Sequence, residues 1–501
     1  MNNFRTITFT VFAVCTISLW LYSCAKSEDI EASQASSPIE KAEYDSVYNK
    51  DISLYVVDND TIAYTNNDEE KELTDTEVRI GQSLSEYAVK MLIDYGQTYT
   101  QNSILSPFCA TTLYSMMANF TSTGKNDYNN EYIKEINANV STTEELNSYH
   151  RKIKDMIKNS NVDEKTETEC SVKNDIYIKE GSTIYRSFLS TSRSYGVAVK
   201  GIELNATGIS EINNSIREHT GDTNIGISNI SKSNSNSIIS SALAFKQLWK
   251  DSFYLDSLFC RFNPEGGDSI ICKALIAERL MHFAKFNSFD MIEIPYKEKY
   301  SMYVMLPNQN ISLSRSLSDL YKEGLNKCIA WVSNSSRTYH YEGIINEIDT
   351  LKSDTIVNLY LPLFKHSATM ELNSANIKKS LYETNLPNVS PNGFKIGNIY
   401  QSCQLEITRD GTSATVESTA ELPPVPTINA GSLNAKNQFI FIRGEEFGEE
   451  NGQGEIRKPK VIKETVTMLF HIDRPFALFI RDNENGAILF SACIKNVLKV
   501  K

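Results

Sequence analysis

The order of the periodic segments constrains the fold more than any other feature of this sequence. Apolar residues recur at helical spacing from Ile80 to Leu92, and a second helical run spans Cys109 to Phe120. Strand-like runs follow at Val172–Ile178, Ser237–Phe245, Met291–Ile294, Ser301–Leu306, Ile356–Phe364, Gln404–Thr408, Glu464–Phe470, Phe476–Ile480 and Ala487–Ile494. Helices first and strands later, without steady β-α-β alternation, predict an α+β fold with mainly antiparallel sheets.

The composition is that of an ordinary globular protein and argues against one class of partner. The 501 residues are 41% hydrophobic and 22% charged, so the chain can bury a sizeable core. The formal net charge is −12 and the sequence has no dense run of Lys and Arg. We therefore expect no nucleic-acid partner.

No motif in the sequence indicates a catalytic or metal site. HExxH, GxSxG and P-loop patterns are missing, and the six histidines are scattered without metal-ligand spacing. A Ser/His/Asp set would be recognisable only in the fold, because its members come from distant parts of a chain. We expect a protein that is not an enzyme and that has no metal or other cofactor.

Residues 1–23 have the pattern of an export signal. Arg5 precedes an apolar run, Ile7 to Tyr22, that is too short for a comfortable membrane helix. The run ends in a Leu-x-small-Cys pattern that resembles a bacterial lipoprotein signal, in which cleavage leaves Cys24 to be lipidated. We expect an exported lipoprotein, anchored to a membrane through Cys24, at the cell surface, the outer membrane or in the extracellular space. A plain secretory signal is the alternative.

The exported chain divides into a polar segment and a globular domain. Residues 24–77 are rich in Ser, Glu, Asp and Asn, which predicts a tether. Within it, Ile52 to Tyr64 predicts a small hairpin around Asp58-Asn59-Asp60. The globular domain begins near Val78 and spans residues 78–501.

Two cysteines have a spacing that permits a disulfide. Cys260 and Cys272 flank the turn signal Asn263 to Asp268 and lie symmetrically about Gly266, so they could face each other in a hairpin. Two buried thiols on neighbouring strands fit the same spacing at least as well. The pairing stays open.

Several segments resemble motifs of the serpin family, in the family's order. They are Asn102–Pro107, Ile212-Asn213 with Thr220 and Ile225, Ala242–Trp249, Ile294–Tyr296, Met305–Pro307, Leu361–Phe364, Asp473–Phe476 and Ile488–Phe490. Each alone is weak, but together they cover roughly residues 78–501. The resemblance implies three mainly antiparallel sheets, about eight or nine helices, an exposed reactive-centre loop, and a monomeric inhibitor whose partner is a protease.

The resemblance places the hinge and bait of the reactive-centre loop at residues 408–427. In serpins a protease cuts this loop, which then inserts into the main sheet as a new strand. A strand added there turns alternate side chains into the core. After the hinge residue Gly411, one face carries only uncharged residues, namely Thr412, Ala414, Val416, Ser418 and Ala420. Every acid falls on the other face, which favours insertion because a buried charge is costly.

The hinge departs from the family pattern in two places. Arg409 stands where the family usually has an acid, two residues before the hinge glycine. Thr415, Val416 and Glu417 replace an alanine-rich run. Because these residues are β-branched or charged, they would slow insertion and favour turnover as a substrate.

Some of the residues that control opening of the main sheet in the family have counterparts in this sequence. Trp249 resembles the tryptophan of the region called the breach, at the end of the main sheet. In the shutter, beneath the sheet, Ser106 is retained, whereas Ser241 and Gln401 stand at the family's Asn and His positions. A changed hydrogen-bond cluster would alter how readily the sheet opens.

The bond that a protease would cut is poorly defined. Family spacing from Gly411 predicts Val425–Pro426, yet a proline after the cut bond blocks most serine proteases. Residues 428–463 look like an insertion that the family generally lacks. The alternative positions for the cut bond are Leu422, Thr427, Ile428 and Arg443. Val or Ile would indicate an elastase-like target protease, and Arg443 a trypsin-like one.

Taken together, these features predict a suicide-substrate inhibitor that traps its protease covalently as the loop inserts. We expect serine proteases as the targets, with papain-like cysteine proteases as an alternative. A second hypothesis is a non-inhibitory binding or adhesion module with the serpin fold, which uses residues 428–463 as its contact surface.

Overall fold

The computed structural model describes most of the globular domain and part of the segment before it. The described residues are 47–58, 72–96, 101–121, 130–159, 169–220, 226–227, 237–333, 338–342, 348–372, 386–396, 398–413, 440–443 and 463–497. Residues 1–23 and Cys24, with the expected signal and lipid anchor, lie outside these ranges. None of the helices that the structure describes is long and apolar enough to cross a membrane.

Eight α-helices occur in the described part of the chain. They are α2 (Asp75–Met91), α3 (Pro107–Met117), α4 (Glu131–Glu135), α5 (Thr143–Asn159), α6 (Arg186–Ser194), α7 (Ala206–Thr220), α8 (Leu313–Glu323) and α9 (Leu325–Ser333). A π-helix, η1 (Leu92–Gly96), continues α2, and a 3₁₀ turn, η2 (Ala118–Phe120), continues α3.

Helix α2 begins three residues before the predicted start of the globular domain at Val78. Thr74 and Glu77 form a capping box, in which the Glu77 N–H donates to the Thr74 hydroxyl and the Glu77 carboxylate accepts from the Thr74 N–H. These two hydrogen bonds satisfy donors that a helix leaves unpaired at its first turn. The helix therefore starts at Asp75.

The strands are numbered in chain order. They are β1 (Val47–Asn49), β2 (Leu54–Val57), β3 (Ser103–Leu105), β4 (Glu169–Lys179), β5 (Thr183–Tyr185), β6 (Val197–Ile202), β7 (Ser237–Leu248), β8 (Tyr254–Phe262), β9 (Ile270–Leu280), β10 (Phe283–Lys285), β11 (Phe289–Pro295), β12 (Tyr300–Pro307), β13 (Thr338–Glu342), β14 (Ile348–Pro362), β15 (Lys365–Glu371), β16 (Asn398–Ile407), β17 (Gly411–Ser413), β18 (Ile440–Arg443), β19 (Lys463–His471), β20 (Phe476–Asp482) and β21 (Ile488–Ile494). Every strand-like run that the sequence predicts overlaps one of them.

These strands form three six-stranded sheets, mostly antiparallel, as predicted, and one small sheet that was not predicted. The main sheet has the order β15-β16-β17-β7-β4-β6, and the second sheet has the order β10-β11-β12-β20-β21-β3. The third sheet runs β18-β19-β14-β9-β8, with β13 paired to β14. The small sheet is β1-β2-β5. The α+β prediction is confirmed.

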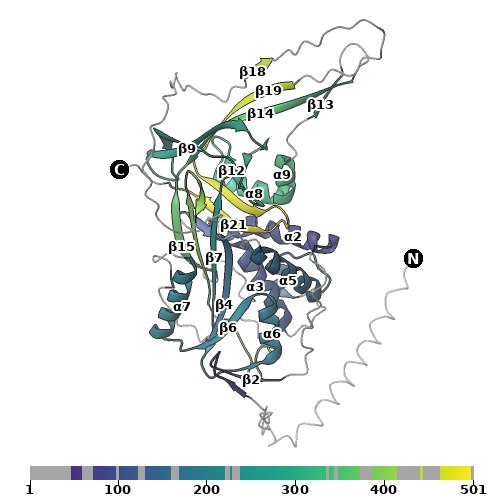
Figure 1. Ribbon diagram of the computed structural model, residues 1–501, viewed down its shortest axis with the longest axis vertical. Coiled ribbons are helices and arrows are strands. Elements are labelled where there is room, and N and C mark those ends of the chain that lie inside the picture. The colour runs from purple at the N-terminus through teal and green to yellow at the C-terminus, as the bar shows by residue number, and fades with distance from the viewer. Residues whose placement is uncertain are drawn as a thin grey trace, which may run out of the picture. The chain divides into compact units, whose positions relative to one another are not determined.

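The two faces of the main sheet are covered by different helices (Figure 1). On one face, α3 and α5 lie over the sheet within the large core, where the Phe245 ring on β7 meets the edges of Tyr300 and Phe490 of the second sheet. On the other face, α7 forms a separate small core, in which Ile212 and Ile216 are buried with residues of β7 and β16. The main sheet is therefore buried on both sides.

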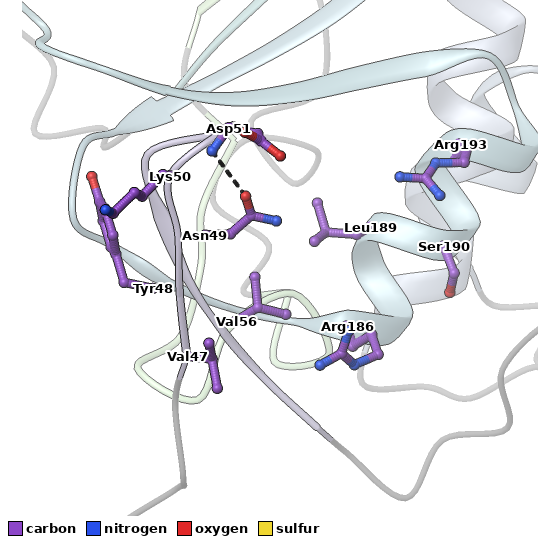
Figure 2. A pocket seen from close by; sticks show the side chains of 10 residues that line it. All are labelled: Val47, Tyr48, Asn49, Lys50, Asp51, Val56, Arg186, Leu189, Ser190 and Arg193. Carbon is purple, nitrogen blue, oxygen red and sulfur yellow. Dashed lines mark hydrogen bonds between the residues drawn. The ribbon is translucent and has the colours of Figure 1, made fainter.

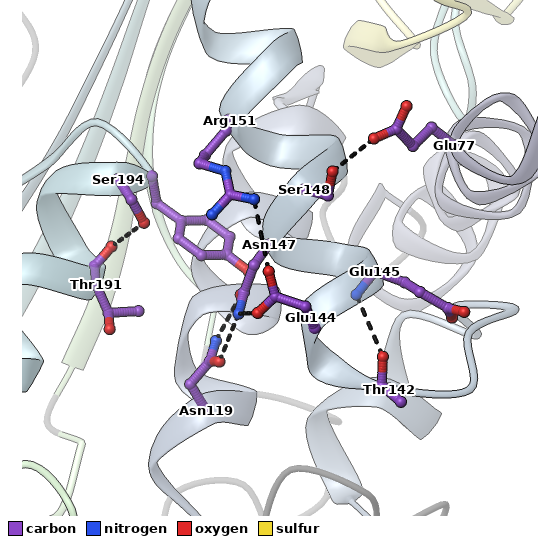
Figure 3. Close-up of polar contacts among 11 residues, drawn as sticks. Glu77, Asn119, Thr142, Glu144, Glu145, Asn147, Ser148, Arg151, Thr191 and Ser194 are labelled. Atoms are coloured by element: carbon purple, nitrogen blue, oxygen red, sulfur yellow. Dashed lines mark hydrogen bonds and ion pairs between the residues drawn. The ribbon is translucent and has the colours of Figure 1, made fainter. Parts of the chain in front are cut away.

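Polar side chains join α5 to its neighbours, as Figure 3 shows. Glu77 on α2 accepts hydrogen bonds from Ser148 Oγ, at 2.7 Å, and from Lys152 Nζ, at 2.8 Å. Asn119 and Asn147 exchange two amide hydrogen bonds of 3.0 Å, which join α5 to η2. Because these groups satisfy one another, the helical layer can bury them without an unpaired donor.

The hairpin predicted before the domain exists, but its turn lies earlier than the sequence indicates. Strands β1 and β2 pair around Lys50–Ser53, not around Asp58–Asp60. The Asp51 N–H donates to the Asn49 side chain at 3.0 Å, a turn-forming bond that pattern counting overlooked. Leu54, Val56 and Val57 are buried, and β2 pairs in parallel with β5. This part of the expected tether therefore belongs to the folded domain.

The hairpin predicted for Cys260 and Cys272 is present. The two residues lie directly opposite each other on β8 and β9. Both are thiols, as are the other cysteines that the structure describes. Of the two possibilities left open by the sequence, the structure has the pair of buried thiols.

Candidate functional site

The first residues of the predicted hinge are already part of the main sheet. Strand β17 lies between β7 and β16 and is antiparallel to both, with Thr412 opposite Ile407 on one side and Gln247 on the other. Further along, Asn398–Cys403 of β16 pair directly with Ile238–Leu243 of β7, in parallel. The main sheet is thus opened at one end only.

Gly411 starts β17 at a point where no side chain fits. A Cβ atom there would lie 2.0 Å from the carbonyl oxygen of Gln247. The preceding turn is closed by Thr408, whose N–H and hydroxyl each donate to the Gly411 carbonyl at 2.8 Å. The hinge glycine is therefore required by close approach of two backbones.

Thr412 points into the core, as the alternation of the sequence predicts. Its exposed fraction is 1%, and its hydroxyl lies 2.7 Å from that of Tyr296. Burial raises the pKa of Tyr296 above its ordinary value, so the phenol stays protonated and can donate this hydrogen bond. The bond offsets the cost of burying both hydroxyls.

Trp249 connects the end of β7 to the segment that enters β17. Its ring stacks on Tyr296, with centroids 4.6 Å apart, and its indole N–H donates to the Thr408 carbonyl at 3.1 Å. Its backbone N–H donates to the Asp410 carbonyl at 2.9 Å. One buried tryptophan thus holds both the aromatic partner of Thr412 and the turn before Gly411.

The three predicted shutter residues meet in the middle of the main sheet. Ser241 on β7 is directly opposite Gln401 on β16. The Gln401 amide accepts from the Ser106 N–H at 3.0 Å and donates to the Ser106 carbonyl at 2.7 Å. The Ser106 hydroxyl caps α3 by accepting from the Cys109 N–H. The Ser241 hydroxyl is buried and has no hydrogen-bond partner among the described residues.

Tyr296 is the functional residue that motif reading missed. It falls within the Ile294–Tyr296 motif, but nothing local indicates that its hydroxyl meets a residue 116 positions away. Strand β11, which ends at Pro295 just before Tyr296, also carries a buried carboxylate. Glu293 Oε1 accepts from the Ser301 and Tyr303 hydroxyls, and its Oε2 lies 2.8 Å from His282 Nδ1.

Burial acts against ionisation of Glu293, but its hydrogen bonds prevail. Desolvation alone would raise the pKa of Glu293, whereas the hydrogen bonds from His282, Ser301 and Tyr303 together lower it below its ordinary value. The hydrogen bond to Glu293 raises the pKa of His282. At any pH between these two pKa values, His282 and Glu293 are therefore both charged.

Most of the remaining loop candidates lie outside the part of the chain that the structure describes. Ala414, Val416 and the candidate cut positions Leu422, Val425, Pro426, Thr427 and Ile428 lie outside the described residues. Arg443 ends strand β18, where its backbone pairs with Glu464 of β19. Cleavage at Arg443 stays a prediction. Strand β18, which comes from the insertion, pairs antiparallel with β19.

A pocket of about 600 Å³ lies between the β1–β2 hairpin and α6 (Figure 2). Exposed Lys50, Arg186 and Arg193 line it, and Arg186 forms an ion pair with Asp58. Its lining includes Ser190 but no histidine or cysteine, so it holds no pair of nucleophile and base. No group of three or more potential metal ligands occurs among the residues that the structure describes.

The three large sheets and their covering helices define an α+β class of protein, in which β17 lies between two strands of the main sheet. A family model for serpin (serine protease inhibitor) matches residues 82–497. The chain belongs to the serpin family. Serpins in general inhibit proteases and do not catalyse a reaction of their own.

Solved serpin structures share this fold at low sequence identity. Human thyroxine-binding globulin complexed with thyroxine has a TM-score of 0.61 and 16% identity, covering 85% of this chain and 100% of that one. The thermophilic serpin Tengpin, in the native state, has a TM-score of 0.59 and 18% identity, covering 86% and 96%. Serpin48 from the insect Tenebrio molitor, described as highly specific, has a TM-score of 0.56 and 16% identity, covering 87% and 100%.

Proposed function

We propose that this chain inhibits proteases as a suicide substrate. The observation that carries the proposal is the position of β17, because Gly411–Ser413 already lie between β7 and β16. The buried Thr412 is the first residue of the uncharged face of the loop. Extension of β17 by the same alternation would bury Ala414 and Val416 next.

In this mechanism the protease supplies the chemistry. Its nucleophilic hydroxyl or thiol attacks the carbonyl of the bait bond, an acyl-enzyme forms, and the new amino terminus leaves. The freed loop then extends β17 between β7 and β16 and carries the acylated protease with it. Insertion faster than water attack on the acyl bond gives inhibition, and slower insertion gives turnover.

Two barriers oppose the extension of β17. The direct pairing of β7 with β16 at Ser241 and Gln401 has to separate, while Gln401 is held by its two bonds to Ser106. The α7 residues Ile212 and Ile216 also lie over this seam, packed with Ala242 and Tyr400. Such barriers would keep the uncut protein in a kinetically trapped state.

The loop sequence also limits the class of target protease and the position of the bond that it would cut. We propose serine proteases as the target class, with papain-like cysteine proteases as the alternative. Val425–Pro426 fits the family spacing, and Leu422, Thr427 and Ile428 are the alternatives that lie close to it. Because proline lacks an N–H and fixes φ, cleavage after Thr427 or Ile428 would suit a serine protease better, whereas Leu422 is itself followed by Pro423.

The test is to incubate the full chain with elastase-, trypsin- and papain-like proteases. We expect an SDS-resistant covalent complex with at least one of them, and a cleaved form with a raised thermal midpoint. Mass spectrometry of the cleaved chain would identify the bond. Cleavage without a complex and without a gain in stability would refute inhibition.

A matched pair of variants separates insertion from recognition. Thr412→Arg places a charge on the buried face, so we expect the ratio of inhibitor consumed to protease trapped to rise at least about tenfold. Ser413→Arg places the same charge one residue later, on the opposite face, and we expect a much smaller change. Equal effects of the two substitutions would contradict insertion in this register.

The second candidate is a binding module with the serpin fold. Strand β18 comes from the 428–463 insertion and adds an edge strand to the third sheet. An edge strand can pair with an extended segment of another chain. Deletion of residues 428–462 would abolish binding to such a partner, and cleavage of the loop would then leave the thermal midpoint unchanged.

We further propose that the protein acts outside the cytoplasm, attached through a lipid on Cys24. The support is the apolar run Ile7 to Tyr22 and the Leu-x-small-Cys pattern at its end. Fractionation of cells that express the full chain should place it in the membrane, and Cys24→Ala should release it. Equal membrane content of the two forms would contradict the anchor.

A further inference from the structure

Two thiols and an imidazole meet on the third sheet. Cys260 on β8 is opposite Cys272 on β9, and its Sγ lies 2.8 Å from Nε2 of His471, the last residue of β19. The Cys272 thiol donates to the Cys260 carbonyl oxygen at 3.3 Å. Two thiols of one hairpin and an imidazole 211 positions from Cys260 are therefore brought together by the fold.

The surroundings of this pair differ from those of the other thiols. Burial raises the pKa of Cys109, Cys170 and Cys493 to about 12, which makes them inert at neutral pH. The hydrogen bond from Cys260, by contrast, lowers the pKa of Cys272. Burial lowers the pKa of His471, so its ring is neutral and Nε2 can accept a hydrogen bond from the Cys260 thiol, 2.8 Å away.

Access decides which sulfur reacts first. The exposed fraction is 7% for Cys260 and 0% for Cys272. Both residues are buried, but Cys260 is the less completely covered of the two, so a small oxidant would reach it before Cys272. His471 lies on that same sulfur, so the accessible thiol is also the one that has a base in contact.

We propose that Cys260 and Cys272 form a reversible oxidation site at which a peroxide converts the two thiols into a disulfide between β8 and β9. The Cys260 thiolate, formed when its proton moves to His471, attacks one peroxide oxygen. The S–O bond forms as the O–O bond breaks, and water leaves. Cys272 then attacks the sulfenic sulfur, the S–S bond forms as the S–O bond breaks, and a second water leaves. Two thiols and one hydrogen peroxide thus give one disulfide and two waters, and a thiol reductant reverses the change.

The β8–β9 hairpin, which the disulfide would cross-link, is hydrogen-bonded to the segment just after β19. The Asn263 N–H and side-chain amide, just after β8, donate to the Asp473 carbonyl at 2.7 and 3.1 Å. Oxidation would remove the Cys260 hydrogen bond to His471 and prevent β8 from separating from β9. Oxidation would thus remove a contact between β8 and the last residue of β19. It does not depend on the proposed inhibitory activity.

The first experiment maps the oxidised cysteines in the reduced full chain. Hydrogen peroxide is added, the protein is denatured, remaining thiols are blocked with N-ethylmaleimide, and a non-reducing digest is analysed by mass spectrometry. We expect the Cys260 and Cys272 peptides to be linked, with a mass about 2 Da below their sum, and to separate with dithiothreitol. Cys109, Cys170 and Cys493 should remain blocked thiols. Uniform oxidation of all these cysteines would overturn the proposal.

Two variants test the roles of the individual groups. Cys272→Ser should abolish the link and leave a sulfenic acid on Cys260 that dimedone traps. His471→Asn should slow formation of the link about tenfold, because asparagine cannot take up the thiol proton. His282→Asn, on the second sheet, is the matched control and should not change the rate. Linking at the wild-type rate in His471→Asn would remove His471 from the mechanism and contradict the site as proposed.

Discussion

The main sheet is open at one end and closed in its middle, although the same two strands form both regions. At the open end, β17 separates β7 from β16, and Trp249 and Tyr296 hold the entering segment. In the middle, β7 pairs directly with β16, and Gln401 bonds to the start of α3. The open end rests on aromatic packing, whereas the closed middle rests on hydrogen bonds between buried polar groups.

The difference indicates where insertion would be controlled. The strand that enters has only to replace the β7–β16 pairing by two new ladders, so its backbone loses no hydrogen bonds. What has to be broken is specific to the middle of the sheet, namely the Gln401 bonds to Ser106 and the contacts of Ile212 and Ile216. Substitutions in the two regions should therefore have different consequences.

The largest effect is expected at the open end. Trp249→Ala would remove a fully packed ring and the hydrogen bond to Thr408, which should destabilise the protein by about 4 kcal/mol and expose β17 to solvent. Denaturant unfolding and hydrogen exchange at Gly411–Ser413 would measure both. The control is Trp331→Ala on α9, where the side chain is 55% exposed and the cost should be below about 0.5 kcal/mol. Equal costs would contradict the role of Trp249.

The next effect concerns the closed middle. Gln401→Leu would leave the buried N–H of Ser106 unpaired and remove one of two bonds to its carbonyl, which also accepts from the Ala110 N–H at 3.2 Å. We therefore expect a loss of about 2 kcal/mol and faster spontaneous insertion of the loop. Ser241→Ala, directly opposite, removes a hydroxyl that has no partner in the described part of the chain, and should cost almost nothing. The denaturation midpoints of the two variants would measure both losses of stability. A larger loss of stability in Ser241→Ala than in Gln401→Leu would contradict the role of Gln401 in keeping the sheet closed.

A smaller change tests the contact that buries the hinge. Tyr296→Phe keeps the ring stacked on Trp249 but removes the hydrogen bond to Thr412, which should cost about 1 kcal/mol. Hydrogen exchange at the Thr412 amide should speed up accordingly. Tyr321→Phe on α8 is the control, because that side chain is 48% exposed. Unchanged exchange in Tyr296→Phe would show that this bond does not hold β17.

The smallest effect is a pH dependence of β11, the strand that ends just before Tyr296. The pKa of His282 is raised from 6.5, so its contribution is complete below pH 6.5 and is lost as pH rises through the higher folded value. The pKa of Glu293 is lowered from 4.5, so its contribution is present above pH 4.5 and is lost as pH falls through the lower folded value. The thermal midpoint should therefore exceed that of His282→Gln most between pH 4.5 and 6.5. A constant difference from pH 4 to 9 would contradict the pair.

Local pattern was enough for several parts of the structure. The α+β class follows from the periodicities, and the family from short motifs whose order is kept. The opposition of Cys260 and Cys272 follows from a turn signal midway between them. In each case the residues that interact are close in sequence, or the feature is an average over many residues, so no distant contact is needed to predict it.

Other parts depend on residues that only the fold brings together. The hairpin turn at Lys50–Ser53 is selected by burial of Leu54, Val56 and Val57, and the more turn-like Asp58–Asp60 segment lies beyond the strand. The meeting of His471 with Cys260 joins strands 211 positions apart. Neither could be read from spacing.

The hinge shows most clearly which features the sequence determines and which only the fold determines. The inward direction of Thr412 follows from period-two alternation, because successive side chains of any strand point to opposite faces. What Thr412 meets inside does not follow from it, because its partner Tyr296 and the Trp249 ring stacked on that partner lie far away in the sequence. Sequence periodicity therefore specifies which side chains can be buried, whereas long-range packing determines the groups that they contact.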